Sequence, residues 1–394
     1  MINSHALSSL QSVLDEIADP VDGWLLFDFR GINPIMTAVV GPEVVGTRRA
    51  YVYIPRGGVP TALVHEIDAE LWRAWPADWR KSVWIRREQL AEQLRALVGG
   101  RRIAMEYSPM GNVPYADYVP AGTLELVRSL GAEPTSSAEL VSRYCSRWSD
   151  AHLAGHRRAA EHVAAIAREA LALAGSRART EDPITEYALG QWVLAAFDRV
   201  GLVTSSAPSV SFGANAARSH YDPTEAESRS IVPGQLLLLD LWAREPDGIY
   251  ADQTWMAAIG APSAHGVEVW EVVREARDAA IALLDSRLRE GRDVTGAEAD
   301  RASRNVIERA GMLERTVCRT GHSIDYVGLH GFGPTIDDTE SFDTRKIIPG
   351  VGFSIEPGIY FPGELGVRSE VNGFARADGL EVTPREYQRE LPVV

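Results

Sequence analysis

The first 148 residues alternate short strand-like runs with amphipathic helical segments. Strands are predicted where apolar, β-branched and aromatic residues cluster, and helices where apolar residues recur at spacings of three and four. The predicted strands cover residues 24–29, 50–55, 81–85 and 101–107, and the predicted helices cover residues 87–100 and 121–131. This alternation predicts a compact α/β domain over residues 1–148.

The pattern changes near Trp148, where long helices replace the short elements. Helices are predicted over residues 152–175 and 185–201, strands over 209–215, 235–242 and 248–260, and a helical block over 267–310, followed by short strands between glycines and prolines. A chain of 394 residues is too long for one ordinary core. We therefore expect an α/β (α+β) protein with a second domain over residues 149–394.

The strand LLLLDLW carries the first sign of chemistry, because Asp240 follows four leucines. A run of this kind is covered on both faces, and an ionised carboxylate there is costly unless a cation pairs with it. The turn REPDG then predicts a hairpin that brings Asp252, twelve residues later, beside Asp240. Two such carboxylates repel each other unless a metal ion lies between them. The open alternative is a single aspartate that caps a neighbouring amide.

Two further acidic residues and two histidines repeat this arrangement near the end of the chain. Glu356 follows an apolar strand in GVGFSIEPG, and Glu370 lies fourteen residues later, across the turn PGELG. His322 and His330 bracket a short apolar stretch in TGHSIDYVGLHG. A lone histidine there is typical of a hydrogen-bonded core residue. Four carboxylates and one imidazole, all ending strands in one domain, favour a metal site.

Oxygen-rich ligation with one nitrogen suits Mn²⁺, Co²⁺ or Zn²⁺ rather than a thiolate-bound structural zinc. Four acidic ligands exceed the need of one such ion, so we expect two divalent ions roughly 3.5 to 4 Å apart, with carboxylates bridging them. A water shared by two ions ionises near neutral pH and attacks a polarised carbonyl. The pattern therefore predicts a hydrolase.

The order Asp240, Asp252, His322, Glu356 and Glu370, with the EPG segment and the spacing of the two glutamates, resembles the pita-bread dinuclear metallopeptidase family. This group contains methionine aminopeptidase, aminopeptidase P and prolidase, with creatinase as a metal-free relative. The resemblance covers most of residues 149–394. More loosely, it implies an N-terminal domain over residues 1–148 like that of creatinase and prolidase.

The resemblance implies a role for each matching residue. Asp240 would bind one ion, Asp252 and Glu370 would bridge both, and His322 and Glu356 would bind the second. Glu356 would also exchange protons with the bridging hydroxide that attacks the peptide.

Three more residues match positions that act on the substrate in this family. His220 would steady the tetrahedral intermediate, and His330 would contact the residue after the scissile bond. Arg368 would either support a metal ligand or contact the substrate. The chain departs from the family pattern in its Asp240 to Asp252 and His322 to His330 intervals, each one residue longer than usual.

Two other departures concern substrate contacts rather than ligands. Trp255 stands where an arginine commonly follows the second aspartate motif, and Val371 replaces the aspartate usual after the last glutamate. Both leave the ligand set intact.

The function implied by this resemblance is hydrolysis of the Xaa-Pro amide bond of dipeptides, with an N-terminal domain that narrows the site and a homodimeric assembly. His330 and Arg368 are the candidates for holding the product-side carboxylate, and Arg30 is a weaker one. Three alternatives stay open: an aminopeptidase P acting on longer peptides, a lyase or non-peptide C–N hydrolase on the same scaffold, and a catalytically silent binding module. The last predicts lost ligands, whereas all five are present.

Charge and cysteine content restrict partners and compartment. A formal charge of −14 and a pI near 5.2 disfavour nucleic acid and membrane partners, and a small peptide substrate agrees better with them. Cys145 and Cys318 form neither a disulfide framework nor a zinc motif, so we expect both to be buried and inert in a reducing compartment. The first residues lack a signal-peptide pattern, which predicts a cytoplasmic protein.

His152 and His156 are expected on a solvated helix face.

Overall fold

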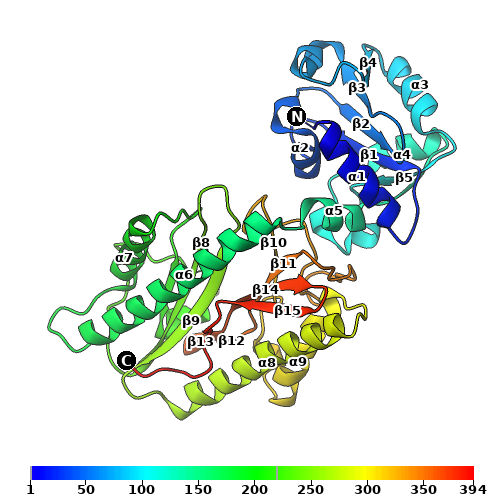
Figure 1. The fold of residues 1–394 in the computed structure, drawn as a ribbon. Helices are drawn as coiled ribbons and strands as arrows, with labels where there is room; N and C mark the ends of the chain where they lie inside the picture. The colour runs from blue at the N-terminus through cyan, green and yellow to red at the C-terminus, as the bar shows by residue number, and fades with distance from the viewer. Residues whose placement is uncertain (1, 219–220) are drawn as a thin grey trace. The chain divides into compact units, whose positions relative to one another are not determined.

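The computed structural model describes residues 2–218 and 221–394 (Figure 1). The chain forms two compact units, an N-terminal unit ending at Cys145 and a C-terminal unit running from Ser146 to Val394. The sequence pattern predicts the domain boundary three residues further along the chain, at Trp148.

The N-terminal unit is built on a six-stranded mixed sheet with the order β4-β3-β2-β1-β5-β6. Its strands are β1 (Gly23–Asp28), β2 (Ala50–Pro55), β3 (Thr61–His65), β4 (Arg80–Trp84), β5 (Arg102–Met105) and β6 (Glu133–Ser136). Its helices are α1 (Ser4–Glu16), α2 (Pro34–Val40), α3 (Arg87–Val98), α4 (Ala121–Ser129) and α5 (Ala138–Cys145). The predicted strands and helices of this unit are confirmed, and α1, α2, α5, β3 and β6 were not predicted.

The centre of this sheet is β1, which is buried along its whole length. It pairs antiparallel with β2 and parallel with β5. Apolar residues of α3 and α4, among them Leu94 and Val127, pack in one cluster with Leu25 of β1. Burial on both faces explains why these strands are continuous apolar runs.

The C-terminal unit contains four α-helices and three small sheets among the described residues. The helices are α6 (Asp150–Arg177), α7 (Glu186–Arg199), α8 (Ala264–Arg289) and α9 (Gly296–Arg309). The strands are β7 (Ser209–Phe212), β8 (Gln235–Ala243), β9 (Ala251–Ile259), β10 (Ser323–Ile324), β11 (Gly352–Ile355), β12 (Gly358–Phe361), β13 (Leu365–Arg368), β14 (Val371–Arg376) and β15 (Gly379–Thr383). The sheets have the orders β7-β8-β9, β10-β11-β14-β15 and β12-β13. The predicted helical block over 267–310 consists of two helices, α8 and α9, with a break between them.

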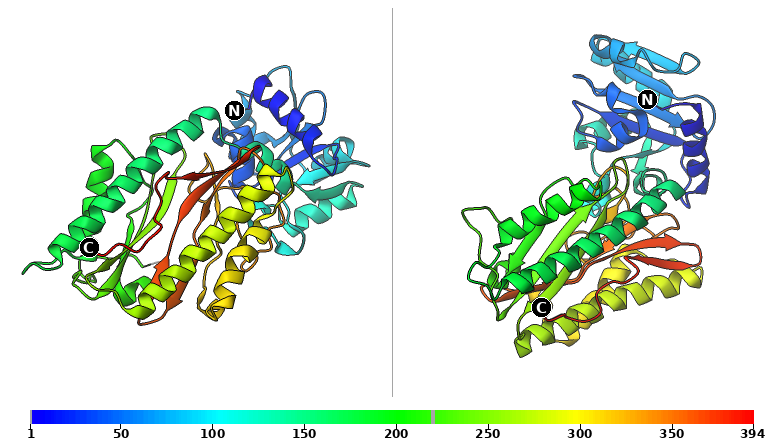
Figure 2. Two further views of the ribbon diagram at one scale, coloured as in Figure 1. Left: turned by 60° about the horizontal axis from the view of Figure 1, so that its bottom comes forward. Right: turned by 60° about the vertical axis from the view of Figure 1, so that its left-hand side comes forward.

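Side chains of β8 alternate between two cores. Leu237, Leu239 and Leu241 pack with α6 and α7, whereas Leu236 and Leu238 pack with α8. In Figures 1 and 2, α6 and α8 accordingly lie on opposite sides of β8 and β9. Both faces of the hairpin are therefore covered, and a polar residue on either face needs a partner.

The buried face of α6 carries one histidine, His156, whose predicted exposure to solvent is wrong. His156 is 1 % exposed rather than solvated, because Nδ1 lies 2.8 Å from the Tyr250 carbonyl oxygen and Nε2 lies 2.8 Å from Thr383 Oγ1. Its ring also packs against Trp148. Two satisfied ring nitrogens make burial of the neutral imidazole acceptable.

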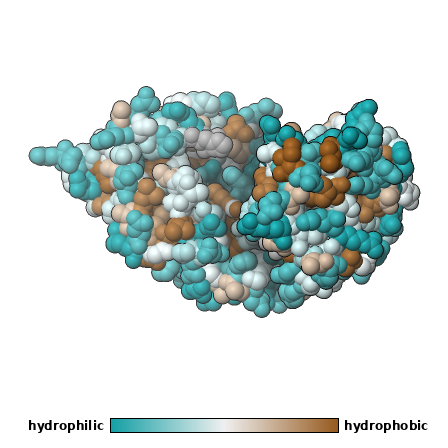
Figure 3. All heavy atoms as spheres, turned by 90° about the horizontal axis from the view of Figure 1, so that it is seen from above, coloured by the Kyte–Doolittle hydropathy of each residue, from teal (hydrophilic) through white to brown (hydrophobic). Residues whose placement is uncertain are grey.

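Surface composition agrees with the polar character of the sequence. Hydrophilic residues cover much of the face seen in Figure 3, and hydrophobic residues lie among them in small groups. Within the described ranges, no helix combines the length and the apolar content needed to span a bilayer.

Candidate metal centre

The hairpin of β8 and β9 positions the first two candidate ligands. Its turn contains Asp247 in the left-handed region with φ of 60°, followed by Gly248, as the REPDG pattern predicted. Asp240 pairs with Thr254, and Asp252 pairs with Trp242. Asp240 and Asp252 are thus diagonal neighbours on one face of the hairpin, the same face that packs against α8 further along.

The other three candidate ligands come from the ends of the β10–β14 region. His322 directly precedes β10, Glu356 directly follows β11, and Glu370 lies between β13 and β14. Asn372 of β14 ties this region to β9, since the Asp252 amide donates to its Oδ1 at 3.0 Å and its Nδ2 donates to the Asp252 carbonyl at 2.7 Å. This pair of hydrogen bonds sets Glu370 opposite the aspartates.

The candidate ligands approach one another closely. His322 Nε2 lies 3.3 Å from Asp252 Oδ2 and 3.4 Å from Glu356 Oε1. Asp252, His322 and Glu370 each offer a ligand atom, and these three atoms lie within 4.8 Å of one another. Residues that are up to 118 positions apart in the chain thus meet in one place.

Burial of so many acids has a strong electrostatic cost. Desolvation raises the pKa of Asp240 to about 7, with the charges of Asp252 and Glu356 adding to the rise and Arg368 opposing it. The pKa of Asp252 is raised, and that of Glu370 is raised well above its usual value, in both cases first through burial. For His322, burial lowers the pKa, but the hydrogen bond to Asp252 and the negative charge of Glu356 outweigh it, so the net shift is upward.

One buried oxygen shows that the protein side chains do not complete this cluster. Within residues 2–218 and 221–394, Glu370 Oε1 is buried and has no hydrogen-bond partner. Such an atom normally costs about 1–3 kcal/mol. A cation at the cluster would satisfy it and offset the carboxylate repulsion. Carboxylates and an imidazole are donor groups that divalent metal ions bind, so the residues of this cluster fit such ions.

Arg368 compensates part of the negative charge. Its Nη2 forms an ion pair with Asp240, its Nε donates to Thr254 Oγ1 at 2.8 Å, and its Nη1 lies 3.9 Å from Glu356. Of the two roles that the sequence left open for Arg368, these contacts favour support of the acidic cluster.

Sequence reasoning missed three supporting residues. Thr254 donates to Glu370 Oε2 at 2.8 Å, and Ser354 donates to Glu356 Oε1 at 2.9 Å and accepts the His322 amide at 3.0 Å. The third is Asn372. All three stand two positions from a candidate ligand, which is the spacing that shares one face of a strand. A small polar residue two positions from a candidate ligand was the sequence signal that could have identified these supporting residues.

The cluster opens into a cavity of about 570 Å³. His330 lies on its wall, with its ring centroid 4.2 Å from that of His322. Cys318 also lines the cavity and is partly exposed, so the expectation that both cysteines are buried is wrong for Cys318, whereas Cys145 is buried. His220 lies outside the described residues.

Comparison with known proteins identifies the group to which this fold and site belong. The family model described as metallopeptidase family M24 matches residues 154–374, which contain all five candidate ligands. The chain belongs to metallopeptidase family M24. This confirms the resemblance seen in the ligand pattern.

Individual proteins resemble this chain in sequence or in fold. An Xaa-Pro dipeptidase of Lactobacillus helveticus is 36% identical over 185 residues, which is 47% of this chain and 46% of that protein. The chain thus spans about half the length of the curated relatives it matches. The dipeptidase PepE of Mycobacterium ulcerans has a TM-score of 0.73 at 21% identity, covering 99% of this chain and 97% of that one. A prolidase of Thermococcus sibiricus has a TM-score of 0.66 at 20% identity and covers both chains fully (100%). The predicted pita-bread fold class is confirmed.

Proposed function

We propose that this chain is a dinuclear metal-dependent peptidase that hydrolyses the Xaa-Pro amide bond of dipeptides. The observation that carries the proposal is the convergence of carboxylates and one imidazole on the wall of a single cavity, with one buried glutamate oxygen lacking a partner among the described residues. The similarity to an Xaa-Pro dipeptidase of Lactobacillus helveticus supports the choice of bond.

The proposed ligand assignment uses all five side chains. Asp240 would hold one ion, His322 and Glu356 would hold the other, and Asp252 and Glu370 would contribute to binding both. Two divalent ions, Mn²⁺, Zn²⁺ or Co²⁺, would supply Lewis acidity and lower the pKa of a water molecule. The contacts of Asp252 and Glu356 with His322 Nε2, at 3.3 and 3.4 Å, support a shared centre for these three residues.

Glu356 is proposed as the group that takes the proton from the attacking water and passes it to the leaving nitrogen. Its Oε1 accepts a hydrogen bond from Ser354, which fixes the carboxylate orientation. General acid–base groups held in this way contribute about 10²–10⁴-fold to a rate. His330, on the cavity wall, is proposed to contact the residue after the scissile bond, and His220 to donate to the oxyanion.

Apolar side chains on the same cavity wall support selectivity for proline. Trp242, Val317 and Leu329 line the cavity together with the acidic cluster. These three side chains can pack against the pyrrolidine ring of a proline residue. They offer no hydrogen-bond acceptor, and a proline residue has no backbone N–H that would need one. The product-side residue would lie between these groups and His330.

Three further features belong to the proposal. The unit ending at Cys145 is a creatinase- and prolidase-like domain, and the unit from Ser146 to Val394 is the catalytic domain. The enzyme acts as a cytoplasmic homodimer. Its partners are small peptides, and neither nucleic acid nor membrane is bound.

The proposal is tested by quantifying metal in the purified chain and then assaying Xaa-Pro and Xaa-Pro-Yaa peptides with and without chelator. We expect about two divalent ions per chain, and chelator-sensitive cleavage of Xaa-Pro. Preference for Xaa-Pro-Yaa would replace the dipeptidase with an aminopeptidase P. Metal binding without cleavage of any proline peptide would overturn the proposal in favour of a lyase or another C–N hydrolase.

A further inference from the structure

We propose that the ion pair between Asp300 and Arg304 of α9 positions the candidate metal centre by fixing residues 316–320 of the cavity wall. This inference rests on the proposed function, because it concerns how two of the proposed ligands, His322 and Glu356, are held for the metal. Arg304 Nε lies 2.7 Å from Asp300 Oδ2, and the two residues stand one helical turn apart. Asp300 is fully buried, and a buried carboxylate is tolerated only when its oxygens are well satisfied.

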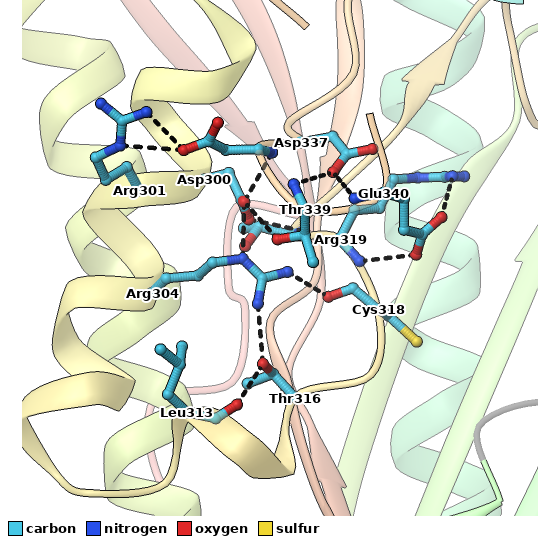
Figure 4. A network of polar contacts seen from close by, with 12 residues as sticks. Asp300, Arg301, Arg304, Leu313, Thr316, Cys318, Arg319, Asp337, Thr339 and Glu340 are labelled. Carbon is cyan, nitrogen blue, oxygen red and sulfur yellow. Dashed lines mark hydrogen bonds and ion pairs between the residues drawn. The ribbon is translucent and has the colours of Figure 1, made fainter. Parts of the chain in front are cut away.

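The remaining groups of the ion pair bind the segment that leads to the metal centre. Figure 4 shows Arg304 reaching from α9 towards Thr316 and Cys318. Its Nη1 donates to Thr316 Oγ1 at 2.9 Å, and its Nη2 donates to the Cys318 carbonyl at 2.7 Å. Asp300 Oδ1 accepts the Thr320 amide at 3.2 Å. Three alternate residues of one segment are thus held by one ion pair.

Thr320 passes this position on to two proposed ligands. Its carbonyl accepts the Glu356 amide at 2.6 Å, and the His322 carbonyl accepts the Ser354 amide at 2.9 Å. These two hydrogen bonds set His322 opposite Glu356, with Nε2 and Oε1 3.4 Å apart. A displacement of Thr320 relative to α9 would therefore change the distance between two groups proposed to bind the same ion.

Gly321 shows how tightly this segment is packed. A β-carbon at this position would collide with the Ser354 carbonyl oxygen. On the other side, the Gly321 amide donates to the Ile336 carbonyl at 3.1 Å, and the Ile336 amide donates back at 2.9 Å. Close packing of this kind transmits a displacement to its neighbours rather than absorbing it.

The same ion pair also holds a second part of the cavity wall. Asp300 Oδ2 accepts the Asp338 amide at 2.9 Å. Glu340, two residues further along, lines the cavity, as do Val317 and Cys318 of the first segment. Because Asp300 is buried, its contacts with both segments are shielded from solvent and salt.

The expected value of the ion pair lies in position rather than in stability. Apolar or neutral side chains of similar size often replace a buried ion pair with little loss of stability. They cannot replace the hydrogen bonds to the Cys318 carbonyl and the Thr320 amide. Groups that orient metal ligands from outside typically contribute about 10- to 100-fold to metal affinity.

The test uses the double variant Asp300→Asn/Arg304→Met in the full chain, which keeps the size of both side chains and leaves no unpaired buried charge. Calorimetric titration of the metal-free protein with Mn²⁺ should show an affinity lower by about 10-fold or more. Hydrogen exchange, followed by mass spectrometry on the metal-free protein, should become faster in residues 316–322 and 352–356 and stay unchanged in α7. The matched control is Arg301→Met, which removes an exposed ion pair between α9 and Asp338.

Among the described residues, Arg301 has no hydrogen bond to residues 316–320, so its variant should bind Mn²⁺ within about threefold of the unaltered chain. If the double variant does not fold, Arg304→Lys decides. It keeps a charge beside Asp300 but cannot reach both Thr316 and Cys318, so its affinity should still fall.

Unweakened Mn²⁺ binding by the folded double variant, or by Arg304→Lys where that variant decides, would overturn the inference. A loss in Arg301→Met as large as in the double variant would do the same. A role in folding alone would lower the melting temperature and speed exchange throughout the C-terminal unit without weakening metal binding, which also contradicts the inference. If the unaltered chain binds no divalent metal, the proposed function fails and this inference fails with it.

Discussion

The Thr254 hydroxyl donates a hydrogen bond to Glu370 Oε2 at 2.8 Å, across the interface between β9 and the start of β14. The same hydroxyl accepts the Nε–H of Arg368 at 2.8 Å. Thr254 therefore links Glu370, whose pKa is raised well above its usual value by burial, to Arg368, which forms an ion pair with Asp240. One oxygen atom orients two charged side chains of the candidate metal centre.

Replacing Thr254 by valine keeps the shape of the side chain and removes both hydrogen bonds. We expect metal affinity to fall by about 10- to 100-fold, because residues that orient ligands typically contribute that much. Calorimetric titration of the metal-free protein with Mn²⁺ or Zn²⁺ measures the effect directly. Thr254→Ser retains the hydroxyl and should bind metal within about threefold of the unaltered protein. Equal affinity for the valine variant would show that Glu370 is positioned by its backbone alone.

Glu356→Ala removes both a proposed ligand and the proposed proton carrier. Turnover of an Xaa-Pro dipeptide should fall by at least about 10²-fold, while circular dichroism and melting temperature should show a retained fold, because Glu356 lies on the cavity wall rather than in an apolar core. Glu364→Ala, on the exposed turn between β12 and β13, is the matched control. Substantial activity in Glu356→Ala would contradict the proton-transfer role.

The two cysteines should differ in reactivity towards an alkylating reagent. Iodoacetamide should modify Cys318, which lines the cavity, and spare Cys145, which is fully buried. The added group occupies space in the cavity that holds the candidate ligands, so we expect inhibition that Cys318→Ser prevents and that a bound dipeptide slows. Peptide mass spectrometry locates the label, and activity is followed in parallel. Full labelling of Cys318 with unchanged activity would place substrate elsewhere in the cavity.

The fold was predictable where the hydrophobic pattern is regular. The run Leu236 to Leu239 predicted a covered strand, and the REPDG and PGELG turns predicted the two hairpins that separate the paired acids. Helix α2 escaped prediction because it has only seven residues and most of them are apolar, so no helical period can be seen in it. Helix α1 carries Leu7, Leu10 and Leu14 at helical spacing, and the prediction overlooked it. Tertiary packing, not local propensity, decides such short elements.

The site was predictable as a set of ligand types but not as a network. Charged residues within or next to apolar strands stand out in a sequence, because burial of a charge demands a partner. The expectation that all of them end strands is wrong for Asp240 and Asp252, which lie within β8 and β9. The contacts of Arg368 with Asp240, and of Arg304 with the Cys318 carbonyl, join segments whose spatial proximity no spacing reveals. The same holds for His156, which looked like a surface residue until its partners Tyr250 and Thr383 were known.

His156 gives the C-terminal unit a defined dependence of stability on pH. Burial lowers its pKa from 6.5 to about 4, against the smaller opposing effect of the Tyr250 carbonyl. In the unfolded chain the imidazole takes up a proton below about pH 6.5, whereas in the folded chain it stays neutral down to about pH 4. The unfolded state therefore binds more protons in this window. Stability contributed by neutral His156 is complete above pH 6.5 and is lost as pH falls.

The expected loss is about 2 kcal/mol between pH 6.5 and pH 5, since each pKa unit corresponds to about 1.4 kcal/mol. Urea unfolding gives the free energy of unfolding of the unaltered chain and of His156→Gln at pH 7.5 and at pH 5. The expected loss is measured as the change, between the two pH values, in the difference between these free energies. His162→Gln, at an exposed position of the same helix, corrects for general effects of removing a histidine from α6. The glutamine variant should be the less stable protein at pH 7.5, and the gap should narrow at pH 5. A gap that stays constant across this range would mean that His156 is protonated equally in the folded and unfolded states.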